Sequence, residues 1–193
     1  MDDASEVWKT GWMVDRPPET VTADGLVLDR VGEQHLDAVV AAVRQSLAEL
    51  HEFMPWATMD YGVEEAEFFV SDSIAAWQEG RSFTYVIWSG HGDGGIFGTA
   101  GLMNRVRPGT LEIGYWVTTA HTGQRLARRS SSLLIGVCSA LEGVDTIEIH
   151  HDEANLASRS VPAALGFQQR GVKEVEVSAP GETGRLAVWA LDI

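Results

Sequence analysis

The stretch of sequence with the clearest chemical potential lies between Leu111 and Phe167. An apolar run that ends at Val117 leads into the turn TGQRLA, residues 122–127, and a helical pattern follows. The start of a helix offers unpaired backbone N–H groups and a partial positive charge, and a glycine lets a ligand approach the backbone. This arrangement indicates an anion site, above all for a phosphate, although a single glycine in such a turn is weak evidence by itself.

Arginines cluster around the same turn. Arg125, Arg128 and Arg129 lie close together, and Arg105 and Arg107 lie shortly before them. Because the chain as a whole is acidic, with 14 Lys+Arg against 28 Asp+Glu, a basic island favours an anionic ligand here. The alternative is that these arginines only decorate a solvated helix face.

Other groups that could do chemistry have simpler explanations. His150 and His151 stand beside two acidic residues, but neighbours on a strand point to opposite faces, so we expect no metal site. The single cysteine, Cys138, falls on the buried side of a predicted helix and has the character of a core residue. The sequence contains no G-x-S-x-G element that would support a hydrolase.

The elements that must position these residues are strands and helices in alternating groups. Apolar residues recur at helical spacing from Glu33 to Leu50, after Gly62 and after Gly123, and a shorter helix is expected at 155–165. Runs rich in β-branched and aromatic residues predict strands at 25–29, 82–88, 96–103, 110–117, 146–150, 172–177 and 186–193, with a turn at 90–95. We expect one α/β domain over residues 25–193, preceded by an extension over residues 1–24.

The composition is that of one globular domain. With 193 residues, of which 45% are hydrophobic and 22% charged, the chain suits a single core. No apolar run approaches the ~18–20 residues that cross a bilayer, and the acidic N-terminus lacks the features of a signal peptide. One cysteine cannot form an internal disulfide, so we expect a cytoplasmic protein without a membrane partner. The formal charge of -14 disfavours nucleic acid and suits cationic substrates such as amines.

Four segments of the chain resemble the coenzyme-A-binding half of GNAT acetyltransferases: EIGYWV (112–117), TGQRLA (122–127), IEIH (147–150) and N-x-A-S-x-x-x-x-A-x-L-G-F (155–167). The branch they resemble most is that of the ribosomal-protein N-terminal acetyltransferases, which FMPWA (53–57) and VWALDI (188–193) also fit. The resemblance covers about residues 25–193. It implies the GNAT fold, a mixed, mostly antiparallel central sheet with splayed middle strands and flanking helices.

The resemblance also implies acetyl-coenzyme A as cosubstrate, without a metal. The pantetheine arm would lie between strands 112–117 and 147–150 and would use exposed backbone groups as an added strand does. A backbone N–H near Trp116 or Val117 would polarise the acetyl carbonyl, and the pyrophosphate would bind the amides of residues 123–127. The residues expected to bind the cosubstrate are Trp116, Val117, Thr122, Gly123, Gln124, Arg125, Leu126, Ala127, Arg128 and Asn155.

Two residues after the last of these strands have roles implied by the resemblance. Asn155 would hydrogen-bond the pantetheine arm, and Ser158 would protonate the departing thiolate, which is a poor leaving group without a proton donor. Each also has an ordinary alternative, since Asn155 suits a helix cap and Ser158 the first turn of that helix.

One residue departs from the family pattern. The turn of the family runs Q/R-x-x-G-x-G/A, and Arg125 stands where its central glycine is expected. If the backbone there needs a positive φ, a residue other than glycine costs ~1–2 kcal/mol. The guanidinium would recover this cost by pairing with a phosphate; otherwise the turn is remodelled and cosubstrate binding is weakened.

The acceptor is expected to be a primary amine, and most simply a peptide N-terminal α-amine. An α-amine with a pKa of ~7.8 is partly neutral at neutral pH, whereas a lysine at ~10.4 needs about 3 kcal/mol more to lose its proton. Glu112 is the leading candidate base, because several GNAT members carry a glutamate at this position that works through water. Its alternative is a strand glutamate that faces solvent or an arginine. Glu174 and Glu176 are weaker candidates.

Two other functions stay open at this point. One is an acyltransferase for a small-molecule amine, either an antibiotic or a metabolite, which would share the fold. The other is an acyl-coenzyme-A-binding module that has lost catalysis, which is suggested by Arg125 in place of the expected glycine. The resemblance is also compatible with a homodimer.

Overall fold

The computed structural model describes residues 14–89 and 95–193. In these residues eight strands form one sheet in the order β1-β2-β3-β4-β5-β6-β8-β7. The strands are β1 (Thr20–Ala23), β2 (Leu26–Arg30), β3 (Ser82–Ser89), β4 (Gly98–Arg107), β5 (Thr110–Val117), β6 (Thr146–Asp152), β7 (Gln168–Glu174) and β8 (Arg185–Asp192). All neighbouring strands pair antiparallel except β5 and β6, which run parallel.

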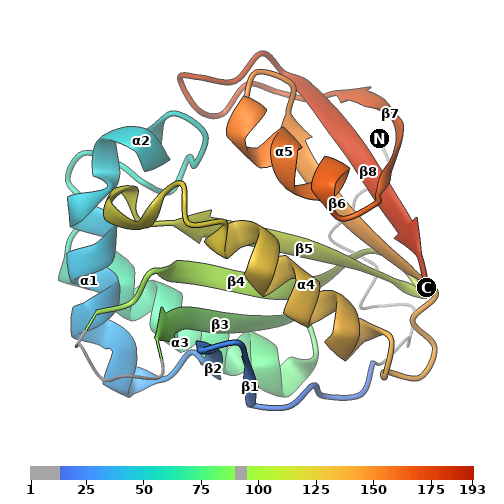
Figure 1. Ribbon diagram of the computed structural model, residues 1–193. Helices are drawn as coiled ribbons and strands as arrows, with labels where there is room; N and C mark the ends of the chain where they lie inside the picture. Colours follow the sequence, from blue (N-terminus) through green and yellow to red (C-terminus); the bar gives the residue numbers. More distant parts are fainter. Residues whose placement is uncertain (1–13, 90–94) are drawn as a thin grey trace.

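Helices cover both faces of this sheet (Figure 1). They are η2 (Glu33–His35), α1 (Leu36–Gln45), α2 (Leu47–His51), α3 (Val63–Glu79), η3 (Thr119–His121), α4 (Leu126–Cys138) and α5 (Leu156–Ala164). No helix in the described ranges is long and apolar enough to cross a bilayer. The expected fold, a mixed and mostly antiparallel sheet with flanking helices, is confirmed.

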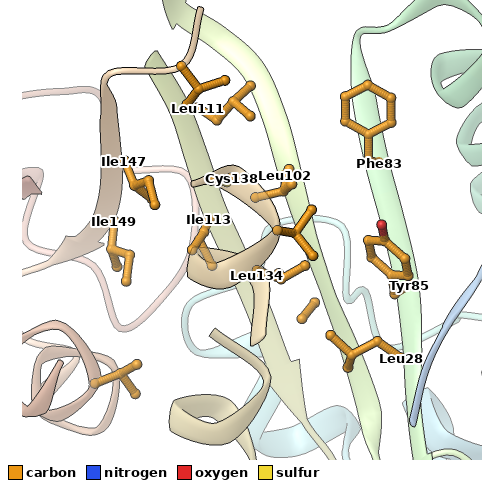
Figure 2. Packing of buried hydrophobic residues seen from close by; sticks show 14 of the residues in the cluster. Leu28, Phe83, Tyr85, Leu102, Leu111, Ile113, Leu134, Cys138, Ile147 and Ile149 are labelled. Carbon is orange, nitrogen blue, oxygen red and sulfur yellow. The ribbon is translucent and has the colours of Figure 1, made fainter. Parts of the chain in front are cut away.

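The core is divided into two clusters by the sheet. Beneath α4, Leu134 and Cys138 belong to one cluster with Leu111, Ile113, Ile147 and Ile149 of the two central strands (Figure 2). The second cluster combines residues of α1 and α3 with Val86 and Trp116. Cys138 is fully buried, as expected, and burial raises the pKa of its thiol to about 12.

The N-terminal part of the fold differs from the expectation in two places. Residues 20–23, within the stretch expected to be an extension, form the edge strand β1, while residues 1–13 lie outside the described part of the chain. The helix expected from Glu33 to Leu50 is divided at Ser46, whose buried Oγ accepts the N–H of Thr119 at 3.0 Å. Helical periodicity does not reveal this tie to a distant loop.

The bounds of two strands were predicted incorrectly. β4 spans Gly98–Arg107 and not 96–103, and β7 spans Gln168–Glu174 and not 172–177. β7 is exposed on both faces and its pairing with β8 contains an irregularity between Gln169 and Gly171. An edge strand exposed on both faces has no alternation of apolar residues that could reveal its limits. The turn expected at 90–95 lies outside the described residues except for Gly95.

The central strands separate, as the resemblance implied. β5 and β6 pair through only three residues each, and the last pair is Glu112 with Glu148. In Figure 1 the two strands meet near the C-terminus of the chain and diverge from there, with α5 lying on the side of β6. Beyond this pair, β5 keeps only β4 as a paired neighbour, and β6 keeps only β8.

Candidate active site

A cavity of about 920 Å³ lies where β5 and β6 separate. Side chains alternate between the two faces of a strand, so Gly114 and Trp116 face the α1 and α3 side, and Tyr115 faces the α4 and α5 side. All three residues line the cavity, together with Val39 of α1 and Ser158 of α5. The cavity therefore reaches both faces of the sheet through the splay, so two reactants can approach from opposite sides.

Backbone groups of both central strands point into the opening. The N–H of Thr118 donates to the carbonyl of Phe97 (2.8 Å), which places this group on the β4 side. Because backbone groups alternate along a strand, the N–H of Trp116 also points to β4, and the N–H of Val117 points to the β6 side. Of the two amides expected near the acetyl group, that of Val117 faces the opening.

The turn before α4 has the backbone of an anion site. Gly123 has φ 76° and Arg125 has φ 60°, so both adopt the left-handed conformation. Arg125 directly precedes Leu126, the first residue of α4, and accepts the N–H of Arg129 at 2.9 Å. The N–H groups of residues 126–128 therefore begin the helix without intrahelical partners. Arg125, which stands where the family turn has a glycine, therefore adopts a conformation that favours glycine.

The residues of this turn are placed beside the cavity, not in it. Thr122, Gly123, Gln124 and Arg125 are exposed, Ala127 and Arg128 are half-buried, and the side chain of Leu126 is buried in the core beneath α4. None of them lines the cavity. Their backbone groups and the exposed side chains of Thr122, Gln124 and Arg125 are available to a ligand outside the cavity.

Tyr115 and Ser158 form a pair of hydroxyl groups on the α5 side. The Oη atom of Tyr115 lies 3.1 Å from both Oγ and the carbonyl oxygen of Ser158. Burial raises the pKa of Tyr115 to about 12, so the phenol stays protonated at neutral pH. No role was predicted for Tyr115 from the sequence, although the strand period places it on the face opposite Trp116.

Asn155 adopts the ordinary role that the sequence left open. Its Oδ1 accepts the N–H of Ser158 at 3.0 Å and so caps α5. Because the cap uses only the oxygen, the Nδ2 group can still donate to a ligand. Both residues line the cavity, where they lie together with Tyr115.

Glu112 also lines the cavity, and it is paired with an arginine. Arg105 donates to both carboxylate oxygens, through Nε at 2.9 Å and through a terminal nitrogen at 2.8 Å. The carboxylate is 6% exposed. This is the alternative that the sequence left open for Glu112. The two weaker candidates, Glu174 and Glu176, are exposed and do not line the cavity.

Glu148 and His150 continue this charged group onto β6. Glu148 accepts from Arg107 and from Nε2 of His150, each at 2.7 Å. The hydrogen bond from His150 and the bond from Arg107 lower the pKa of Glu148 to about 2. Nδ1 of His150 lies 3.6 Å from Oε2 of Glu112. From the sequence, His150 was weighed only as a metal ligand, because nothing local shows that two carboxylates flank it.

His151 is directed to the other face of β6, as expected. The indole N–H of Trp189 donates to Nε2 of His151 (3.0 Å), so the proton of the neutral ring is on Nδ1, which donates to the carbonyl of Asp152 (2.8 Å). The two histidines therefore do not act together. Within residues 14–89 and 95–193, no group of three or more His, Cys, Asp or Glu side chains could hold a metal ion.

The mouth of the cavity on the α3 side is aromatic and acidic. Trp56 and Phe68 line it and remain 42% and 73% exposed, and Glu64 lies beside them. The loop between β7 and β8 closes one side, because the N–H of Gly181 donates to the carbonyl of Glu52 at 2.8 Å. A Cβ atom at Gly181 would lie 2.7 Å from that carbonyl, so only glycine allows this approach.

Comparisons with known proteins agree with this geometry. The family model described as an acetyltransferase (GNAT) domain matches residues 26–168. One similar solved structure is RimL, a ribosomal L7/L12 alpha-N-protein acetyltransferase in complex with coenzyme A; the chains are 21% identical with a TM-score of 0.80 over 91% of this chain and 98% of that one.

Two further structures resemble the chain in the same way. The microcin C7 self-immunity acetyltransferase MccE, in complex with acetyl-CoA and AMP, is 17% identical with a TM-score of 0.81 over 92% of this chain and 98% of its own. RimJ from Mycobacterium smegmatis, in complex with CoA-disulfide, is 23% identical with a TM-score of 0.72 over 93% and 86%. No curated protein sequence matches the chain.

Proposed function

Because the chain belongs to the GNAT acetyltransferase family, we propose that it transfers an acetyl group from acetyl-coenzyme A to the N-terminal α-amine of a protein or peptide. The observation that carries this proposal is the end of the β5–β6 pairing at Glu112 and Glu148, which opens a cavity through the sheet. The solved structures that resemble the chain include N-terminal acetyltransferases of the ribosomal protein L7/L12. Homodimer formation stays a prediction.

The residues around the splay fit acetyl-coenzyme A. The outward-facing backbone groups beyond Glu112 offer the pantetheine arm the hydrogen bonds of an added strand, and Nδ2 of Asn155 offers another. The helix start at residues 126–128 and the Arg125 guanidinium suit the pyrophosphate. When bound, the cosubstrate supplies an activated acetyl thioester. The N–H of Val117 is the group that would stabilise negative charge on its carbonyl oxygen.

Ser158 and Tyr115 are the proton donors for the leaving group. Ser158 Oγ lies at the cavity wall, and the neighbouring phenol of Tyr115 can return a proton to it. Because burial raises the pKa of Tyr115 to about 12, this phenol keeps its proton over the whole physiological range. A thiolate that leaves as a thiol departs more easily, which is the task of a general acid.

The α3 side of the cavity would receive the acceptor. Exposed Trp56 and Phe68 offer apolar contact to the residue that carries the amine, and Glu64 favours a cationic group at the entrance. An α-amine needs the least help to become neutral, which supports it over lysine as the acceptor. For Glu112, the role of base stays a prediction, although Arg105 already holds both of its oxygens.

The experiment is a thiol-release assay over a panel of acceptors. Peptides with free N-termini, the same peptides with blocked N-termini and an internal lysine, and small amines such as aminoglycosides are compared with acetyl-coenzyme A in excess. We expect release with free N-termini and none with blocked ones. Release with small amines alone would support the small-molecule acyltransferase. Failure to bind acetyl-coenzyme A in calorimetry would contradict the proposal as a whole.

A further inference from the structure

His150 lies on β6 just beyond the last pair that β6 makes with β5. That pair is Glu112 with Glu148, so His150, two residues further along, stands where the two strands have separated. A strand advances ~3.3 Å per residue, so the Cα atom of His150 is about 6–7 Å beyond that of Glu148 along β6, while its Nδ1 lies 3.6 Å from Oε2 of Glu112. His150 lines the cavity.

The hydrogen bonds of His150 decide which ring nitrogen carries the proton. Glu148 is ionised at neutral pH and can only accept, so Nε2 of His150 must be the donor in their 2.7 Å contact. In the neutral ring Nδ1 is then the atom with the lone pair. The ring is 12% exposed, and Oε2 of Glu112 lies 3.6 Å from Nδ1, which is the distance of an ion pair and not of a hydrogen bond.

Charged side chains surround this imidazole. Carboxylates flank the ring from both central strands, while Arg105 already compensates Glu112 through two hydrogen bonds. The charged groups that contact His150, pair with such a contact or line the same cavity are Glu148 and Asp152 of its own strand, Glu112 of β5, Arg105 and Arg107 of β4, Glu64, Glu65 and Asp72 of α3, and Glu182 of the β7–β8 loop. The paired β8 residue, Val188, adds no charge.

We propose that His150, through Nδ1, accepts the proton that the acceptor amine must lose, and that Glu148 is the positioning residue that holds its tautomer. This inference rests on the proposed function. It resembles the general arrangement in which a carboxylate orients a histidine base. Glu112 then stabilises the imidazolium. Glu112 itself is a weaker base, because Arg105 donates to both of its oxygens.

The proton balance of the step is complete. The ammonium of the acceptor gives one proton to Nδ1 of His150 and becomes a neutral amine. The amine nitrogen forms its bond to the acetyl carbon as the carbon–sulfur bond breaks, and the sulfur keeps the electron pair. The nitrogen releases its second proton to solvent, His150 later returns the first one to solvent, and the thiolate takes one proton from Ser158, which Tyr115 and solvent replenish. One proton in total leaves to solvent.

The test compares His150→Gln with Glu112→Gln across a range of pH. Glutamine at position 150 can still donate to Glu148 but cannot take up a proton. We expect His150→Gln to lower kcat/KM by about a hundred-fold at neutral pH and to remove the acid limb of its pH profile, while Glu112→Gln keeps that limb. The matched control is His35→Gln, a histidine 3.6 Å from Asp29 and away from the cavity, which should retain the wild-type profile.

A second measurement does not depend on activity. In full-length protein labelled at the histidine nitrogens, NMR should show the His150 proton on Nε2, identified by its loss in His150→Gln, and Glu148→Gln should disturb this tautomer. A proton on Nδ1, or a His150→Gln variant with the wild-type rate and pH profile, would overturn the assignment of His150. A wild-type chain that releases no thiol with any free amine would contradict the proposed function instead.

Discussion

Glu112 of β5 and Glu148 of β6 are paired in parallel register, and they are the last pair before the two strands separate. Like charges that lie side by side on a sheet repel, and both carboxylates are only 6% exposed. Each is compensated by its own arginine from β4, Glu112 by Arg105 and Glu148 by Arg107. A layer of ion pairs therefore marks the point at which the sheet opens.

Replacing Glu148 should change how stability depends on pH. Its pKa is about 2 in the folded protein against an ordinary value of 4.5, because His150 and Arg107 donate to it. A carboxyl group whose pKa is lowered by folding stabilises the protein at pH values above its ordinary pKa. This contribution is lost as the pH falls toward the pKa of the group in the folded protein. We expect Glu148→Gln to lower the free energy of unfolding by about 2–3 kcal/mol near neutral pH.

Urea denaturation at several pH values checks this expectation. The difference between wild type and Glu148→Gln should shrink between about pH 4.5 and about pH 2. Glu174→Gln, at an exposed position on β7, is the control and should change stability little at any pH. A difference that stays the same down to the acid end would mean that the Glu148 carboxylate is not stabilised by its partners.

Replacing Arg125 separates backbone strain from phosphate binding. Glycine at this left-handed position should relieve strain and leave the free energy of unfolding unchanged or higher by up to about 1 kcal/mol. Loss of a charge-assisted contact should weaken coenzyme A binding on the order of ten-fold or more. Arg125→Asn is the matched variant, because asparagine tolerates the left-handed region but has no charge.

Calorimetric titration of coenzyme A into the three proteins gives the answer for Arg125. Weaker binding by both variants is the expected result. Tighter binding by Arg125→Gly would indicate that the arginine obstructs the site, and would favour a module that has lost catalysis.

Asn155 offers a test that distinguishes a helix cap from a ligand contact. Asn155→Ala should cost about 1 kcal/mol of stability, because the N–H of Ser158 loses its acceptor. Asn155→Asp keeps an acceptor oxygen and should retain the cap. Both variants lose the Nδ2 donor, so both should raise KM for acetyl-coenzyme A. If Asn155→Asp bound acetyl-coenzyme A as the wild type does, the side chain would be a cap alone.

Removing either hydroxyl of the Tyr115–Ser158 pair should slow the chemical step. We expect Ser158→Ala and Tyr115→Phe to lower kcat by about ten-fold to a hundred-fold with little change in KM for acetyl-coenzyme A. An acid loses its proton above its pKa, and burial raises the pKa of Tyr115 to about 12. Deprotonation of Tyr115 should therefore not lower kcat of the wild type below about pH 10.

The double variant completes this test. Two groups in one relay should give a combined loss no larger than the greater single loss. Variants that keep the wild-type kcat would show that the pair has no part in protonating the thiolate, and independent, multiplying losses would show that the two hydroxyl groups act separately.

Local sequence determined much of the fold because each signal spans only a few residues. The β-branched and aromatic run at Thr110–Val117 predicts β5 with its observed limits, and Gly80 ends α3 in the left-handed conformation. The segments around Gly123 and Asn155 also carry the family resemblance. Their spacing reflects backbone requirements of a strand, a turn and a helix start, which a short stretch of chain meets by itself.

Only the tertiary structure decided how the candidate site is connected. Strand periodicity assigns Glu112 to a face, but its pairing with Arg105 depends on the β4–β5 register and on the irregularity between Met103 and Arg107. The contact of Tyr115 with Ser158 joins residues that are 43 positions apart, and Glu148, which contacts His150, also accepts from Arg107, 41 positions away. Such roles follow from where two strands separate and which charges meet there, and a pattern along one strand does not contain that information.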